Sequence, residues 1–354
     1  MDTPNPRSYI GPVARRSANA GTLIGGLDGP PYVEPTELRR VYRRLVEVAT
    51  REAPRPELDA GYRLTWGRAD ESGWLDLAAK PGAFAVIGRH DRADLVLAGN
   101  EEVSLRHLLA TAYVLPRADR GRADVALRLL DLRATLPILL DDGTARRSIV
   151  ATGPLCVRLG GYVLAAFPIH EGNLEVAGTM QLDPSGPPPS VVHAASLPPK
   201  RTSRAWSTSN ISVLPDSSMI SQIIERAEVQ PPVGARVTLE RDGRGTTVAL
   251  SEAELANGVL IGRAEKCLDQ GLRALLTGRV SRVHLLLLAD PLHANGRVLA
   301  YDLCTTNGTR RGGELFRSTT LDDDGAELLL GSRRDGVTLR WRRTTAPAPE
   351  GASR

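Results

Sequence analysis

The sequence has few of the residues that mark secreted, metal-binding or membrane-spanning proteins. Its three cysteines, Cys156, Cys267 and Cys304, are too widely separated for a disulfide framework or a zinc site. The six histidines form no HxxxH or HExxH pattern, so no metal site is expected. No apolar run reaches the roughly 18 residues of a membrane helix, and the first residues lack the basic-then-apolar pattern of a secretory signal. We therefore expect a cytoplasmic chain without a membrane span.

Lysine is almost absent from the basic residues. Lys80, Lys200 and Lys266 are the only lysines among 45 cationic side chains. The arginine excess fits phosphate recognition, because guanidinium groups bind phosphate well, but a GC-rich bacterial genome explains it more simply. The net charge is only +4 and aromatic residues make up 4% of the chain, too few for a base-stacking surface. Nucleic acid is therefore not an expected partner.

Three stretches have the composition of disordered segments. Residues 1–33 are rich in Gly, Pro, Ser and Asn without periodicity, which predicts a disordered arm. Residues 169–232 contain proline clusters and many Ser and Thr residues. They are predicted to be a disordered linker, with one short helix near 218–229. A polar tail is expected at 344–354.

The remaining segments have regular patterns. Within 34–60, apolar residues from Leu38 to Val48 recur at helical spacing, and prolines follow, which predicts a helix. Over 61–168 and 233–343, short alternating or apolar runs lie between turn residues. Such short strands are typical of an antiparallel sandwich or barrel. We predict an all-β chain with two antiparallel β-sandwich domains and a short N-terminal helix.

The two β segments share five landmarks in the same order. Each opens on Gly-x-Arg-x-Thr, followed by Ile-Gly-Arg, Val-Ser-x-x-His, Asp-Leu and Leu-Gly. The landmark residues are Gly61, Gly88, His107, Asp131 and Gly160 in the first segment and Gly234, Gly262, His284, Asp302 and Gly331 in the second. The order predicts two copies of one domain.

Three motifs of the second segment form a specific set. They are Gly262-Arg263, Ser281-Arg282-Val283-His284 and Thr306-Asn307-Gly308-Thr309. In this order they resemble the forkhead-associated (FHA) domain, a β-sandwich module that binds phosphothreonine peptides. The resemblance covers about residues 234–341, and it implies a bacterial tandem-FHA protein whose first domain is degenerate.

The side chains in these motifs have the chemistry of a binding site. The Arg263 guanidinium can pair with a phosphate dianion, Ser281 adds a hydroxyl donor, and Arg282 adds a second cation. The Asn307 amide can bond to a peptide backbone. The sequence contains no nucleophile–base motif, phosphate-binding P-loop or kinase motif set. We therefore expect no enzymatic activity and no cofactor.

The resemblance implies a role for each residue of the set. Arg263 and Ser281 would bind the phosphate, Arg282 and Thr306 would assist, and Asn307 would bind the main chain of the ligand. The residues implied to be structural beside the site are Gly262, His284 and Gly308.

The first copy keeps part of the pattern. Arg89, Ser104 and Thr135 occupy the places of Arg263, Ser281 and Thr306. These three residues predict a weak second anion site. The partly kept pattern as a whole implies the fold of a degenerate FHA domain.

Other positions of the first copy differ. Leu105 stands in the place of Arg282, and Arg106 is shifted by one residue, which would direct it to the opposite face of a strand. Leu136 stands in the place of Asn307, so the amide is missing. We expect this copy to serve mainly in domain packing or phosphate-independent contacts.

Two threonines of the linker are candidate phosphosites. Thr179 and Thr208 each have an apolar residue three positions on, a position that FHA domains commonly recognise. If phosphorylated, they could bind Arg263 in the same chain or cause self-association, because tethering raises the effective concentration. The simpler interpretation is an inert spacer.

The predicted function is a non-catalytic phosphothreonine-peptide-binding adaptor in Ser/Thr kinase signalling. Its partner would be a phosphothreonine-containing protein, either a Ser/Thr kinase or a kinase substrate. The alternative is a phosphate-independent scaffold that uses both FHA folds for docking. Binding that survives phosphatase treatment would distinguish the second hypothesis from the first.

Overall fold

β-strands make up most of the structure, which confirms the all-β prediction. The computed structural model describes residues 35–68, 71–115, 124–140, 143–174, 193–196, 233–269, 271–291, 297–321 and 325–344. The predicted arm, most of the predicted linker and the end of the tail lie outside these residues, as do Thr179, Thr208 and the helix expected near 218–229. None of the described helices is both long enough and apolar enough to cross a membrane.

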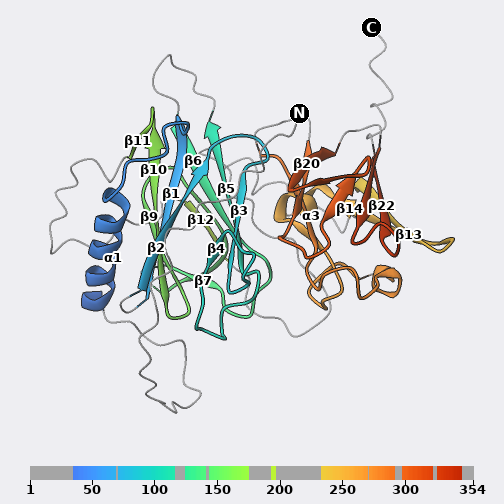
Figure 1. Cartoon of the computed structure of the whole chain (residues 1–354), viewed down its shortest axis with the longest axis horizontal. Coiled ribbons are helices and arrows are strands. Elements are labelled where there is room, and N and C mark those ends of the chain that lie inside the picture. Colours follow the sequence, from blue (N-terminus) through green and yellow to red (C-terminus); the bar gives the residue numbers. More distant parts are fainter. Residues whose placement is uncertain are drawn as a thin grey trace, which may run out of the picture.

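Helix α1 (Pro35–Thr50) covers one face of the first sheet (Figure 1). Its apolar side chains recur at helical spacing, and Tyr42 and Leu45 are buried in one cluster with Val163 and Phe167 of that sheet. The helix ends at Thr50, a few residues before Pro54, as the sequence predicts.

The first sheet, which we call the N-terminal β unit, folds over its own core. Its strands are β1 (Ala60–Arg68), β2 (Glu71–Ala78), β3 (Phe84–Gly88), β4 (Leu95–Val96), β5 (Leu108–Leu115), β6 (Asp124–Asp131), β7 (Ile138–Leu139), β8 (Ala145–Ala151), β9 (Leu155–Leu159), β10 (Tyr162–His170), β11 (Asn173–Leu174) and β12 (His193–Ser196). They follow the order β2-β1-β10-β9-β7-β8-β6-β5-β3-β4, with β11 beside β10 and β12 beside β8. Only the β3–β4 pair is parallel among the described strands. Side chains from both ends of this order, such as Leu77 of β2 and Leu95 of β4, share one buried core.

Two short strands fall inside the segment that was predicted to be a disordered linker, so that prediction is wrong at these positions. β11 extends a hairpin from β10, with Ile169 opposite Leu174. β12 pairs with β8, with His193 opposite Val150. A free strand edge binds any chain through backbone groups, so a composition rich in proline and small residues does not exclude such pairing.

The C-terminal β unit contains two sheets. Its strands are β13 (Val233–Arg241), β14 (Arg244–Ser251), β15 (Val259–Ile261), β16 (Leu285–Ala289), β17 (Val298–Asp302), β18 (Thr309–Arg311), β19 (Glu314–Phe316), β20 (Ser318–Leu321), β21 (Ala326–Leu330) and β22 (Val337–Arg343). One sheet has the order β14-β13-β22-β21-β18-β19 and the other β15-β16-β17-β20. Helix α3 (Glu252–Asn257), which the strand patterns did not predict, begins at a capping box formed by Ser251 and Glu254.

The two units share one strand order. The order β2-β1-β10-β9-β7 of the N-terminal unit corresponds to β14-β13-β22-β21-β18, and β8-β6-β5-β3 corresponds to β20-β17-β16-β15. They differ in that β8 pairs with both β7 and β6, which joins the two layers into one sheet. In the C-terminal unit two separate strands make these pairings, β19 with β18 and β20 with β17. The repeated sequence landmarks therefore lie at equivalent places in the two units.

The two units lie side by side (Figure 1) and share a buried contact. A buried apolar cluster contains side chains of both units. Counted from the landmarks, its members include the matched pairs Val86 and Leu260, Leu109 and Leu286, Leu130 and Tyr301, and Leu132 and Leu303. Phe84 and Tyr301 meet across this interface with ring centroids 4.9 Å apart. The sheet that carries the Gly-Arg and Ser-x-x-His motifs thus faces its own counterpart.

Candidate functional site

Three loops of the C-terminal unit bring the predicted site residues together. Arg263 follows β15, Ser281 and Arg282 precede β16, and Thr306 and Asn307 lie between β17 and β18. The first two loops are joined by backbone bonds from the Arg263 N–H to the Ser281 carbonyl (3.3 Å) and from the Ala264 N–H to the Arg282 carbonyl (2.7 Å). These loops are fixed relative to one another by the sheet from which they come.

Arg263 is exposed, and one hydrogen bond holds its guanidinium in place. Its Nε donates to the Val280 carbonyl at 2.6 Å, while no described residue accepts a hydrogen bond from its terminal nitrogens. The preceding Gly262 allows the loops to approach closely, because a Cβ there would lie 2.4 Å from the Arg282 carbonyl oxygen. The Nε bond places the guanidinium beside the residue that precedes Ser281, and its terminal nitrogens have no acceptor among the described residues.

Asn307 connects the third loop to the second. Its Nδ2 donates to the Arg279 carbonyl at 2.7 Å, so part of its amide is already used within the chain. The next residue, Gly308, has a φ of +73°, and a Cβ there would lie 2.3 Å from a methyl carbon of Leu315. Both the left-handed backbone and the close approach require glycine at this position.

His284 lies behind the site and is fully buried. Its Nδ1 accepts a hydrogen bond from the Ser281 N–H at 3.0 Å, and its backbone bonds to Ile261 and Leu303. Burial lowers the pKa of His284 to about 4, against the opposing effects of the Asp302 carboxylate and the Gly308 carbonyl. The ring is therefore neutral near pH 7, and His284 connects the loops through Nδ1 and its backbone.

We expect the stability of the chain to fall between about pH 6.5 and about pH 4, partly because of His284. A histidine of the unfolded chain binds a proton near pH 6.5, but folded His284 does so only near 4. The unfolded state therefore binds more protons in this window, and the free energy of unfolding decreases as the pH falls. His107, with its pKa lowered to about 4, acts in the same direction. Burial raises the pKa of Asp131 to about 6, which acts in the opposite direction.

Urea unfolding at about pH 7 and about pH 4.5 measures this effect. The variant His284→Gln keeps a neutral acceptor and donor and should lose less stability than the wild type between the two values. Equal losses in the two proteins would contradict the assignment to His284.

Asp302 is a residue of the site that the sequence analysis used only as a landmark. Its Oδ1 accepts from the Thr305 N–H at 2.8 Å, and its Oδ2 accepts from the hydroxyls of Thr305 (2.7 Å) and Thr309 (2.6 Å). The carboxylate thereby fixes the inner side of the loop that carries Thr306 and Asn307. An aspartate at a strand end with threonine three residues on is a local signal for such a turn.

The N-terminal unit keeps the backbone framework of these loops. Arg89 N–H bonds to the Ser104 carbonyl at 3.2 Å, and the Ser104 N–H bonds to His107 Nδ1 at 3.0 Å. Arg89 and Thr135 are exposed and Ser104 is half-buried. Arg89, Ser104 and Thr135 thus have the same degree of exposure as Arg263, Ser281 and Thr306.

The same unit lacks several polar contacts of the C-terminal site. Asp131 is bonded by the Arg147 guanidinium in place of the two threonine hydroxyls that bond Asp302. Leu105 is 39% exposed where the other copy has an arginine. Arg106, shifted by one position, lies in the turn before β5, where it is buried and bonds to the other unit.

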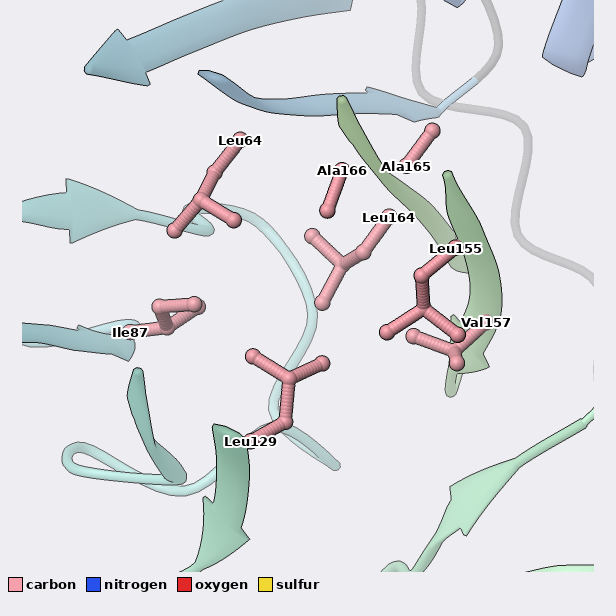
Figure 2. A pocket seen from close by; sticks show the side chains of 8 residues that line it. All are labelled: Leu64, Ile87, Leu129, Leu155, Val157, Leu164, Ala165 and Ala166. Atoms are coloured by element: carbon pink, nitrogen blue, oxygen red, sulfur yellow. The ribbon is translucent and has the colours of Figure 1, made fainter. Parts of the chain in front are cut away.

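Neither of two cavities within the described residues contains a predicted site residue. One is an apolar gap of about 10 Å³ in the core of the N-terminal unit, lined by leucine, isoleucine, valine and alanine side chains (Figure 2). It is at the lower limit for a single water and offers no polar partner. The other, about 250 Å³, lies between the units beside Tyr113 and Tyr301. The predicted site is instead an open loop surface, which suits an extended peptide better than an enclosed small molecule.

Comparison with solved structures finds FHA domains. The chain is similar to FHA-1 of Mycobacterium tuberculosis Rv1747, with 22% identity, 31% of this chain and 99% of that one covered, and a TM-score of 0.23. It is similar to the FHA1 domain of yeast Rad53, with 19% identity, 36% of this chain and 87% of that one covered, and a TM-score of 0.26. It is also similar to the yeast Dun1 FHA domain in complex with a doubly phosphorylated Rad53 peptide. The identity is 10%, 33% of this chain and 80% of that one are covered, and the TM-score is 0.26. No family model and no curated protein matches the chain.

Proposed function

We propose that the chain is a phosphothreonine-peptide-binding adaptor built from two FHA-type β-sandwiches, of which the C-terminal one carries the binding site. The observation that carries this proposal is the convergence of Arg263, Ser281, Arg282, Thr306 and Asn307 on three linked loops. Two exposed guanidinium groups, a hydroxyl and an amide at one surface match a phosphate with an adjacent peptide backbone.

The partner would be a phosphothreonine-containing protein, either a Ser/Thr kinase or its substrate. Thr179 and Thr208 of the chain itself are candidate ligands, in the same chain or in a second copy. A tethered peptide reaches an effective concentration in the mM range, so even a weak site would fill once the threonine is phosphorylated. Arg89, Ser104 and Thr135 would form a weaker anion site in the N-terminal unit.

Full-length protein and a fluorescein-labelled degenerate phosphothreonine peptide library test the proposal. We expect saturable binding of the phosphothreonine library in fluorescence polarisation, with weaker binding of the phosphoserine library and none of the unphosphorylated library. Equal binding of all three, or no binding at all, would contradict it. Capture of an unmodified partner after phosphatase treatment would instead favour the phosphate-independent scaffold.

A further inference from the structure

Four consecutive carbonyls beside the proposed site accept hydrogen bonds from two arginines of the N-terminal unit. They belong to residues 303–306, directly before Asn307. Arg106 donates to the first two, through Nε and, at 2.9 Å, through Nη2. Arg92 donates through Nη1 to the third and fourth at 3.4 and 3.3 Å. Two loops of the N-terminal unit, one before β4 and one before β5, therefore bond to four successive carbonyls of this loop.

The contact is continuous with other bonds between the units. Arg317, whose carbonyl accepts from the Asp302 N–H, forms an ion pair with Asp94 at 2.7 Å. Arg133 donates to the Lys266 carbonyl at 2.8 Å, in the loop that follows Arg263. The loop that carries Arg263 and the loop that carries Thr306 and Asn307 thus both bond to the N-terminal unit.

The two units differ at this contact, although their faces are equivalent. Arg106 corresponds to Val283 of the C-terminal unit, which has no donor. Only 7% of Arg106 is exposed, so its guanidinium is desolvated and depends on these carbonyls for hydrogen bonds. The copy that lost the phosphopeptide residues is the one that supplies the arginines.

We propose that Arg92 and Arg106 are positioning residues for the phosphopeptide site, so that the degenerate copy completes the site of the other copy; this rests on the proposed function. Fixing four carbonyls fixes the peptide planes of residues 303–306, and hence the positions of the Thr306 hydroxyl and the Asn307 amide. A loop fixed in advance loses less conformational entropy when the peptide binds. By linkage, the bound peptide strengthens the contact between the units by the same factor.

The full-length variant Arg92→Ala tests the proposal, because Arg92 is exposed and its loss does not disrupt a core. We expect the Kd for the degenerate phosphothreonine library to rise about 2- to 30-fold, the range for residues that act on a site without touching the ligand. Amide hydrogen exchange in residues 303–308 should accelerate while the thermal midpoint stays unchanged. Arg92→Lys, which keeps a donor, should restore part of the affinity.

A matched control is Arg68→Ala. It also removes a bond from an arginine Nη1 to a backbone carbonyl, that of Gly99 at 2.7 Å, but within the N-terminal unit, and it should leave the Kd unchanged. If the wild type binds the library and Arg92→Ala binds equally well, the positioning role is overturned and the proposed function stands. If the wild type does not bind the library, both are overturned.

Discussion

Replacing Arg263 with alanine should weaken phosphothreonine-peptide binding by about 10- to 150-fold, which corresponds to roughly 1.5–3 kcal/mol for hydrogen bonds to a charged group. The Nε bond to the Val280 carbonyl at 2.6 Å sets the plane of the guanidinium. No described residue accepts a hydrogen bond from the two terminal nitrogens, so we expect them to bind the phosphate. Because a guanidinium can bind two phosphate oxygens at once, its loss removes both charge and geometry.

Fluorescence polarisation with the phosphothreonine library measures this loss. Arg263→Lys keeps the charge but not the planar fork, so its affinity should lie between those of the wild type and the alanine variant. Arg340→Ala serves as the control, because Arg340 is an exposed arginine paired with Glu240 on the other sheet of the same unit. The thermal midpoint of Arg263→Ala should match the wild type, since the side chain is exposed. An alanine variant that binds as tightly as the wild type would exclude Arg263 from the site.

Much of the fold could be predicted because the repeated landmarks lie where the backbone tolerates few residues. Gly262 permits a contact too close for a Cβ, and Gly308 adopts a positive φ. His284 and Asp302 each accept a hydrogen bond from a backbone N–H three residues away in the same loop. Each of these requirements restricts the residue type at one position, so it appears in the sequence as a fixed residue type at a fixed spacing.

The contacts between the units could not be predicted in this way. The sequence analysis placed Arg106 on the opposite face of a strand. It lies instead in the turn before β5, buried, with partners about 200 residues further along the chain. Backbone carbonyls are present at every residue, so no residue type marks them as acceptors. The same reason explains why β12 was missed, because it joins the sheet by antiparallel pairing with β8, and such pairing uses backbone groups that every non-proline residue has.

Arg63 is another arginine whose role the sequence does not reveal. It is fully buried, between helix α1 and the N-terminal sheet. Its Nε and Nη2 bond to the two oxygens of Asp76 at 2.7 and 2.8 Å, and Trp74 stacks on the guanidinium at 4.2 Å. The remaining donors bond to the carbonyls of Ala49, Glu52 and Ala53, at and beyond the end of the helix. One side chain therefore satisfies an otherwise isolated carboxylate and the C-terminal carbonyls of α1.

The substitution Arg63→Met should destabilise the chain by about 3–5 kcal/mol, the cost of leaving a buried charge without its partner. Urea unfolding followed by circular dichroism measures the change. The double variant Arg63→Met/Asp76→Leu should recover part of the loss, because it removes the unpaired carboxylate as well. Arg340→Ala, which breaks an exposed ion pair, should cost less than about 1 kcal/mol. If Arg63→Met costs no more than Arg340→Ala, the buried network does not stabilise the attachment of α1, and apolar packing of Tyr42 and Leu45 alone would account for it.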